Sequence, residues 1–168
     1  MHRFFIKNIN LNGPVLTLPE SVSRQITRVL RLKPGEKITV LDGSGFESQA
    51  VLTIVNETNC QVSVEPRTMG STEPTVHLHM MLALTQREKF EWMLQKCTEI
   101  GVSTFHPFVS SRTLVQKPDE LEEKRDRWEK ILQEAAEQSH RGRIPELLPT
   151  KKFKEAVSSE FGENVLKV

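Results

Sequence analysis

The chain has 168 residues, which is enough for one full domain or two small ones. With 37% hydrophobic and 27% charged residues it has the composition of a globular protein, and its net charge of +1 gives no bulk electrostatic reason to bind nucleic acid or a membrane. The start, MHRFFIKN, lacks the apolar core of a signal peptide, and no apolar run approaches the roughly 20 residues that span a bilayer, so we expect a cytoplasmic protein.

Residues 1–68 are predicted to be mostly β-strand. The runs RFFI, KITVLDG, SQAVLTIV and CQVSVEP are rich in β-branched or aromatic residues, and turn-forming Gly, Pro, Asn and Asp separate them. Many short strands with Gly-rich turns are typical of a small β-barrel. One helix is expected among them, because four apolar residues recur at the spacing of one helical face: Val22, Ile26, Val29 and Leu30.

Positive charge gathers at the N-terminus. Residues 1–37 hold seven Lys or Arg and two acidic residues, whereas residues 38–68 hold one Arg and four acidic residues. Arg24, Arg28 and Arg31 lie opposite the predicted apolar face, and no acidic residue between positions 21 and 35 is available for an ion pair inside the helix. Guanidinium groups bind phosphate in bidentate fashion. The stripe is therefore either a solvated face or a phosphate-binding surface, which Arg3 and Lys7 could extend.

Residues 69–75 have the composition of a linker, and we place a domain boundary there. Strands and helices alternate after it, an order typical of an α/β domain with a parallel sheet. The apolar run TVHLHMMLAL predicts a strand buried on both faces. The next segments predict a helix ended by Gly101, the strand VSTFHPFV, a long helix over residues 118–139 and a short helix near residues 150–159.

The last residues, NVLKV, are predicted to begin a third strand of this sheet. Three strands make a poor parallel sheet, and a buried strand is not expected at the terminus of a complete fold. We therefore interpret the chain as the front part of a longer protein.

Two features of the sequence resemble functional sites, but the residues alone do not establish a function for either. The Asp42–Gly45 segment lacks the spacing of a Walker or dinucleotide loop, so we expect a hairpin turn there. Lys96 and Glu99 are spaced to form a surface ion pair on a helix. Since Glu99 near a helix C-terminus opposes the helix dipole, a role in a site is equally supported.

The spacing of cysteines and histidines does not indicate metal binding or a disulfide. Of the two cysteines, neither belongs to a CxxC pair. Four histidines lack the spacing of a ligand cluster and have no neighbouring carboxylate or Cys partners: His77, His79, His106 and His140. We therefore expect no metal site.

The stretch AEQSHRGRIP, residues 136–145, closes the long helix with an unusual group of polar residues. Cations in a last helical turn are favoured by the helix dipole, which accounts for Arg141 and Arg143. Gln138 does not share that explanation, and loops after helices in α/β domains often contact ligands. From these residues alone, helix capping and ligand binding are equally supported.

Three segments together resemble the bacterial ribosomal RNA small subunit methyltransferase E family: VLRLKPGEKITVLDG, LQKCTEIGVSTFHPFVSSRT and EAAEQSHRGRIPEL. The resemblance covers essentially all 168 residues. The order K-x-T-E-x-G-V followed by E-Q-S-x-R-x-x-x-P is not a general α/β pattern. Members of this family methylate N3 of a uridine in small-subunit ribosomal RNA with S-adenosylmethionine.

The resemblance implies a two-domain α+β protein that forms a homodimer. Residues 1–68 would be a PUA-like, RNA-binding β-barrel, and residues 76–168 the first part of an α/β SPOUT-type methyltransferase domain without its trefoil knot. The family's motif positions fall on the following residues: Arg28, Val29, Leu30, Arg31, Gly35, Lys96, Glu99, Gly101, Pro107, Arg112, Glu137, Gln138, Arg141 and Pro145.

This sequence departs from the family in two places. Family members often carry a His pair where this chain has Arg24 and Gln25. The knot segments that form the cofactor pocket, which resemble G-P-E-G-G and L-G-x-R-I-L-R-x-E-T-A, are not found and would follow Val168. We therefore expect no cofactor-binding residues in this chain, and expect the chain by itself to be inactive.

The resemblance favours the AEQSHRGRIP stretch as a surface that faces RNA or the catalytic cleft. Its partners would be small-subunit ribosomal RNA or the 30S subunit, with no membrane. The predicted RNA-binding residues are Arg3, Arg24, Arg28, Arg31, Arg112 and Arg141. The catalytic candidates are Arg141, Gln138 and Glu99, of which Arg141 and Gln138 are expected to serve the reaction more than the fold. The alternative is a non-catalytic RNA-binding module; a metal hydrolase would need a cluster that the sequence lacks.

Overall fold

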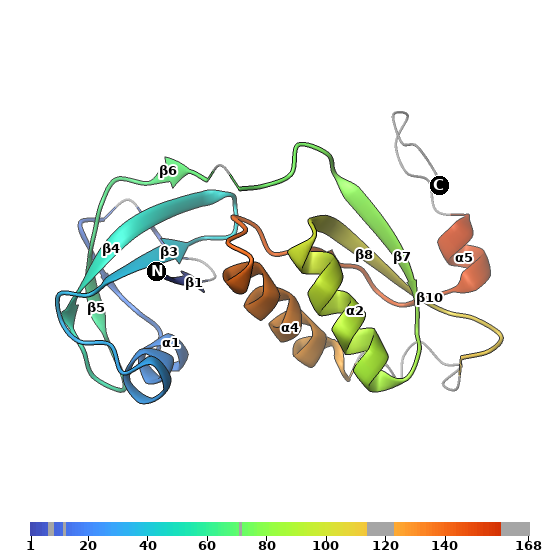
Figure 1. The fold of residues 1–168 in the computed structure, drawn as a ribbon, viewed down its shortest axis with the longest axis horizontal. Coiled ribbons are helices and arrows are strands. Elements are labelled where there is room, and N and C mark those ends of the chain that lie inside the picture. The colour runs from blue at the N-terminus through green and yellow to red at the C-terminus, as the bar shows by residue number, and fades with distance from the viewer. Residues whose placement is uncertain (7–8, 12, 71, 114–122, 159–168) are drawn as a thin grey trace. The chain divides into compact units, whose positions relative to one another are not determined.

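The computed structural model describes residues 1–6, 9–11, 13–70, 72–113 and 123–158 (Figure 1). The chain forms two compact units, residues 1–75 with 133–144 and residues 76–132 with 145–168. The predicted domain boundary at residues 69–75 stays a prediction. Nothing in the sequence pattern indicated that residues 133–144 would group with the N-terminal unit.

A six-stranded sheet forms the first unit, with strand order β1-β3-β4-β5-β2 and β6 beside β4. The strands are β1 (His2–Phe5), β2 (Val15–Thr17), β3 (Lys37–Leu41), β4 (Phe46–Ile54), β5 (Gln61–Val64) and β6 (Thr68–Met69). β1 pairs with β3 in parallel and the other pairs are antiparallel. The predicted strand runs are confirmed. Within the described residues, β1 and β2 end an open path of strands, so the expected closed barrel is not seen.

Strand β3 is buried on both faces, which places it at the centre of this unit. Ile38 and Val40 pack in the main core of the unit. Leu41 packs with Phe5 and Ala136, of which Ala136 lies on helix α4 (Arg125–Gln138). The Asp42–Gly45 segment joins β3 to β4 as the predicted hairpin turn, with Gly43 and Gly45 at φ of 85° and 100°.

The predicted helix over residues 22–30 is present, but half of it is π-helical. α1 (Glu20–Arg24) continues directly into the π-helix η1 (Gln25–Leu30). Val22 and Ile26 are buried, whereas Val29 is 72% exposed and Leu30 packs against the core instead. A π-turn holds more residues than an α-turn, so the residue that returns to the core comes one position later. The predicted place of Val29 on the apolar face is wrong.

The second unit is an α/β structure with a parallel sheet, as predicted. Strand β8 (Val102–Val109) lies between β7 (Leu78–Ala83) on one side and β9 (Glu146–Leu147) and β10 (Lys151–Lys152) on the other. α2 (Arg87–Glu99) connects β7 to β8, and α5 (Phe153–Val157) follows β10. Gly101 follows Ile100, the C-cap of α2, and has a φ of 106°, which confirms it as the glycine at the end of this helix.

The third strand differs from the prediction. The neighbours of β8 on this side come from residues 146–152, in two strands of two residues each. The predicted strand at residues 164–168 and the predicted start of the long helix at residue 118 lie outside the described residues. β9 and β10 are too short to show any periodicity in the sequence.

The prediction that β7 is buried on both faces is wrong for the described residues. Along β7, where successive side chains lie on opposite faces, most of the side chains are exposed or only half-buried. Leu82 is buried, whereas His79 and Met81 are exposed. Opposite β7, Phe105 of β8 is fully buried. The described residues therefore bury β7 less completely than β8, which has buried residues on both faces.

Candidate functional site

The arginines predicted to bind RNA phosphate lie on the exposed side of the α1–η1 helical segment. Arg24 pairs with Glu20 one turn earlier, and Arg28 pairs with Glu57 in the β4–β5 connection. The prediction that no acidic residue could pair within the helix is wrong, because Glu20 lies one residue before the segment considered. The hydrogen bond and the charge of Arg28 lower the pKa of Glu57. Both pairs are solvated, and exposed ion pairs exchange readily for other partners.

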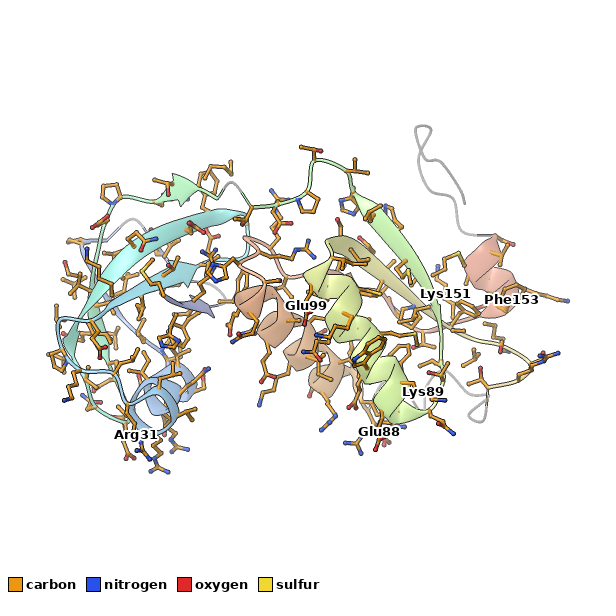
Figure 2. All side chains as sticks on the ribbon, in the orientation of Figure 1. Arg31, Glu88, Lys89, Glu99, Lys151 and Phe153 are labelled. Carbon is orange, nitrogen blue, oxygen red and sulfur yellow. The ribbon has the colours of Figure 1, made fainter. Side chains whose placement is uncertain are left out.

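Arg31 ends this helical segment in the left-handed conformation, with a φ of 54° (Figure 2). Its side chain is exposed, and the described part of the chain offers it no ion pair within 4 Å. Of the three arginines it is therefore the one whose guanidinium group is most available to a phosphate.

The AEQSHRGRIP stretch ends α4 with a regular hydrogen-bonded cap. The Arg141 amide donates to the Ala136 carbonyl at 2.9 Å, and the His140 amide donates to the Glu137 carbonyl at 3.4 Å. His140 takes the left-handed conformation, with a φ of 61°. This is the pattern of a Schellman motif with His in the position that usually holds Gly. The backbone of the stretch thus satisfies the helix end without the cationic side chains.

The Arg141 side chain is buried and bound to Glu73. Its Nη2 and Nε donate to the two Glu73 oxygens at 2.8 Å and 3.3 Å, and the side chain is 4% exposed. Glu73 Oε1 also accepts from the amides of Gly142 at 2.9 Å and Arg143 at 3.1 Å. Burial alone would raise the pKa of Glu73, but the Arg141 guanidinium and the two amides outweigh burial and lower this pKa.

Glu137 and Gln133, one turn apart on α4, bind the free edge of strand β1. Glu137 Oε1 accepts from the Phe5 amide at 3.0 Å, and Gln133 Nε2 donates to the Phe5 carbonyl at 3.4 Å. Gln133 also donates to Glu137 at 3.1 Å. The two side chains replace the strand that would otherwise pair with Phe5. Burial raises the pKa of Glu137 despite these hydrogen bonds.

Arg3 belongs to the same polar cluster and is not exposed as the predicted RNA contact requires. Its Nη2 lies 2.5 Å from Glu47 Oε2, and its side chain is 8% exposed. The same nitrogen donates to the Arg141 carbonyl at 3.4 Å. Roles of Arg3 and Arg141 in RNA binding or catalysis stay predictions, but both guanidinium groups already have carboxylate partners. Gln138, by contrast, is exposed.

A crevice of about 560 Å³ lies in the second unit, at the carboxyl ends of β7 and β8 and the start of α2. Its apolar lining includes Leu84 and the rings of Phe90 and Trp128, whose centroids lie 4.8 Å apart. Three cationic residues line it: Arg87, Arg112 and Lys124. Among the lining residues that the structure describes, none is acidic. Arg112 was predicted to bind RNA from its motif, whereas Arg87 and Lys124 were not singled out.

The turn that carries Arg112 is held by hydroxyl groups. The Ser110 amide donates to Thr113 Oγ1 at 2.9 Å, and the Arg112 amide donates to Ser110 Oγ at 3.3 Å. Thr113 Oγ1 also donates to the Leu84 carbonyl at 3.4 Å, which ties the turn to the end of β7. The SSRT sequence thus fixes the backbone from which Arg112 extends.

Glu99 lies at the end of α2 opposite to Glu88 and Lys89, as Figure 2 shows. Both of its oxygens accept from Lys96 Nζ, at 2.8 Å and 2.9 Å. The ion pair that the spacing predicted is confirmed. A catalytic role of Glu99 stays a prediction.

Three histidines of the second unit contact one another along β7 and β8. His79 Nδ1 lies 3.0 Å from His106 Nε2, and the His77 and His79 rings lie 4.7 Å apart. Burial, followed by the neighbouring histidine, lowers the pKa of both His79 and His106. In the described residues, no group of three His, Cys, Asp or Glu is placed to hold a metal ion. Helices long and apolar enough to cross a membrane are likewise not found among these residues.

The chain matches two families over most of its length. Residues 72–167 match the RNA methyltransferase domain, and residues 21–65 match the RNA methyltransferase PUA domain. Ribosomal RNA small subunit methyltransferase E of Bacillus subtilis is 31% identical over 159 residues, which are 92% of this chain and 62% of that protein. The protein of the same name from Synechocystis is 32% identical over 151 residues, which are 90% of this chain and 48% of that protein.

Solved structures show the same similarity. The Neisseria gonorrhoeae ribosomal RNA small subunit methyltransferase E, bound to S-adenosyl methionine, superposes with a TM-score of 0.86 at 28% identity, over 95% of this chain and 65% of that one. A Legionella pneumophila protein in complex with the same cofactor gives a TM-score of 0.85 at 25% identity, over 94% and 66%. The chain spans less than two thirds of the length of the two curated relatives. Because the family match covers more than half of the chain, the protein belongs to the RNA methyltransferase family that this domain defines.

Proposed function

We propose that this chain is part of an enzyme that methylates N3 of a uridine in small-subunit ribosomal RNA with S-adenosylmethionine. The observation that carries the proposal is the match to the RNA methyltransferase domain over residues 72–167, next to a PUA-domain match over residues 21–65. The relatives named ribosomal RNA small subunit methyltransferase E support the substrate class. The resemblance adds the uridine N3 specificity, a homodimer and a cytoplasmic location.

RNA binding is the part of this function that the described residues support best. Arg28 and Arg31 lie on an exposed helical segment within the PUA match, where phosphate can replace Glu57 as the partner of Arg28. Arg112 lies on the rim of the crevice in the methyltransferase match. Uracil N3 must lose a proton during methylation, and a positive site favours the resulting anion. Gln138, Arg141 and Glu99 remain the catalytic candidates, of which Gln138 has the most exposed side chain.

The crevice does not fit S-adenosylmethionine. Its described lining holds three cationic residues and no carboxylate, and these would repel a sulfonium cation. Cofactor sites are concave and bury most of their ligand. We therefore infer that the cofactor is held by parts of the enzyme other than this crevice.

Methyl transfer tests the proposal directly. The protein encoded by the full reading frame is incubated with methyl-labelled S-adenosylmethionine and 30S subunits that lack the modification, and the labelled nucleoside is identified by mass spectrometry. We expect 3-methyluridine at a single position. Label in another nucleoside, or in no RNA at all, would refute the uridine N3 activity.

A non-catalytic RNA-binding module is the second candidate, and the exposed arginines of the α1–η1 segment favour it independently of any cofactor. The codons that follow Val168 separate the two candidates. A frame that continues into the two knot motifs supports the enzyme. A stop codon directly after Val168, together with tight RNA binding and no methyl transfer, supports the module.

A further inference from the structure

The crevice in the second unit lies where open α/β sheets bind their ligands. Parallel strands β7 and β8 both end at it, and the segments that follow them supply its walls. Ligands of such sheets occupy the crevice outside the carboxyl ends of the strands. Its volume of about 560 Å³ suits a ligand of nucleotide size.

The charge of the crevice favours an anion. Arg87, Arg112 and Lys124 line it without a described acidic residue among them. Glu91 does not line the crevice, but its Oε1 lies 3.1 Å from Arg87 Nε. The same carboxylate accepts from Arg127 Nε at 2.6 Å and from Arg127 Nη2 at 2.8 Å. One carboxylate thus serves two guanidinium groups, which leaves a net positive charge beside the crevice even before Arg112 and Lys124 are counted.

Hydrogen bonds and ring packing hold part of the crevice lining. Hydroxyl groups of Ser110 and Thr113 fix the turn that presents Arg112. The packed rings of Phe90 and Trp128 form an apolar floor, and both residues are at least 96% buried. A cationic rim over an apolar floor suits a ligand that has an anionic end and a flat apolar body.

We propose that this crevice binds one nucleotide of single-stranded RNA, with its phosphate at Arg87, Arg112 and Lys124 and its base toward Leu84 and the aromatic floor. The choice of RNA rests on the proposed function; the choice of a phosphate rests on the crevice itself. Arg87 and Lys124 are thereby assigned as phosphate-binding residues in addition to Arg112.

Binding of uridine 5′-monophosphate and of uridine to the 168-residue chain tests the proposal. Trp92 is exposed, so Trp92→Phe leaves the emission of Trp128 in the floor as the reporter. Amide chemical shifts of residues 110–113 give a second readout. We expect the monophosphate to change both signals and to bind roughly tenfold more tightly than uridine, because a charge-assisted contact is lost with the phosphate. Equal affinities, or no change in either signal, would overturn the proposal.

Charge-removing variants locate the phosphate. We expect Arg112→Gln, Arg87→Gln and Lys124→Gln each to weaken monophosphate binding and to leave uridine binding unchanged. With a short single-stranded RNA, each should reduce the slope of log K against log salt by about 0.7. Lys89→Gln is the matched control, because Lys89 lies on the same helix as Arg87 but does not line the crevice. An equal loss in Lys89→Gln would show a bulk charge effect and sink the assignment.

Failure of this proposal can be told apart from failure of the proposed function. If the full-length protein transfers a methyl group with an unchanged KM for RNA in the Arg112→Gln variant, the crevice proposal fails and the enzyme stands. If the monophosphate binds in the crevice while the full-length protein methylates no RNA, the proposed function fails and the crevice stands.

Discussion

The Glu73 carboxylate organises the loop that follows α4. It accepts hydrogen bonds from the Arg141 guanidinium and from the amides of Gly142 and Arg143. A carboxylate with this many donors is more stable charged than protonated, which is why the pKa of Glu73 is lowered although burial acts in the opposite direction. Arg141 therefore holds the loop in place through its side chain as well as through its backbone.

We expect Arg141→Ala to lower the free energy of unfolding by about 2 kcal/mol, because it leaves a partly buried carboxylate without its charged partner. Urea denaturation measures this value. Gln138→Ala is the control, since Gln138 is exposed on the same helix end and its loss should change stability by less than about 0.5 kcal/mol. If Arg141→Ala leaves stability unchanged and impairs methyl transfer, Arg141 acts on the substrate, as its motif position first suggested.

The same pair predicts a pH dependence. Because the folded pKa of Glu73 is lowered, its contribution to stability is present above the unfolded pKa of about 4.3 and is lost as the pH falls through the folded pKa. Glu73→Gln should thus be less stable than the wild type at pH 7 and should approach it in acid. A stability difference that stays constant down to the acid transition would show that Glu73 gains nothing from its charge.

For Glu137 we expect the opposite pH dependence of stability. Its folded pKa is raised by burial, so ionisation destabilises the fold as the pH rises from about 4.3 through the folded pKa. Glu137→Gln keeps an oxygen that accepts from the Phe5 amide and removes the buried charge. We expect this variant to be at least as stable as the wild type at pH 7 and to lose this part of the pH dependence. Glu88→Gln, on an exposed helix turn, is the control; a clear loss of stability in Glu137→Gln alone would show that the charge is needed.

At the scale of elements, the α1–η1 segment combines a buried side with an arginine-bearing side. Its π-turns bring Leu30 rather than Val29 to the core and end with Arg31 in the left-handed conformation. The arginines thus extend into solvent from a segment that Val22 and Ile26 anchor. An exposed and basic segment suits the phosphates of an RNA backbone.

Replacing both Arg28 and Arg31 by Ala should weaken RNA binding and reduce its salt dependence by a slope of about 1.4 for single-stranded RNA, since fewer counterions are released. The Arg28 change also frees Glu57, which adds a repulsive charge to the same surface. Binding titrations between low and moderate salt measure the slope. Lys89→Ala, which removes one charge from the other unit, is the control. An unchanged slope in the double variant would mean that Arg28 and Arg31 only form a solvated face.

Strands with clear alternation or apolar runs were predictable from the sequence, and so was the Asp42–Gly45 turn between two of them. β9 and β10 were not, because two residues carry no period, and their pairing with β8 depends on the tertiary fold. The π-turns of η1, which shift the apolar face by one residue, were not predicted either, because the spacing of apolar residues was read with the period of an α-helix. Arg112 was found through a motif, whereas Arg87 and Lys124 were not, since only the fold brings their separate segments together around one crevice.

At the scale of the whole molecule, each of the two units is built from two separate stretches of the chain. Residues 133–144 join the N-terminal unit, where Gln133 and Glu137 bind the edge of β1 and Arg141 binds Glu73. The sequence could not show that this helix end binds the edge of β1, because Gln and Glu are common on exposed helix faces and carry no signal for such a contact. Residues 69–75, predicted as a linker, include Glu73, the acceptor on which this loop depends.

The charge of the described surfaces also predicts which small molecules the chain binds. Three cationic residues line the crevice with the apolar floor, and the exposed helical segment of the first unit carries arginines. Both features favour anions, whereas S-adenosylmethionine carries a sulfonium cation and needs a concave site that buries it. The relatives known with that cofactor bound are longer than this chain, which covers 65% and 66% of them.

We therefore expect the 168-residue chain to bind uridine 5′-monophosphate but not S-adenosylmethionine, because the cations that line the crevice would repel the sulfonium group of the cofactor. Isothermal titration calorimetry of the chain with each compound measures both affinities under one condition. The Neisseria gonorrhoeae relative, whose structure contains the cofactor, is the positive control. Micromolar binding of S-adenosylmethionine to the chain would contradict this prediction, and would place a cofactor pocket within residues 1–168.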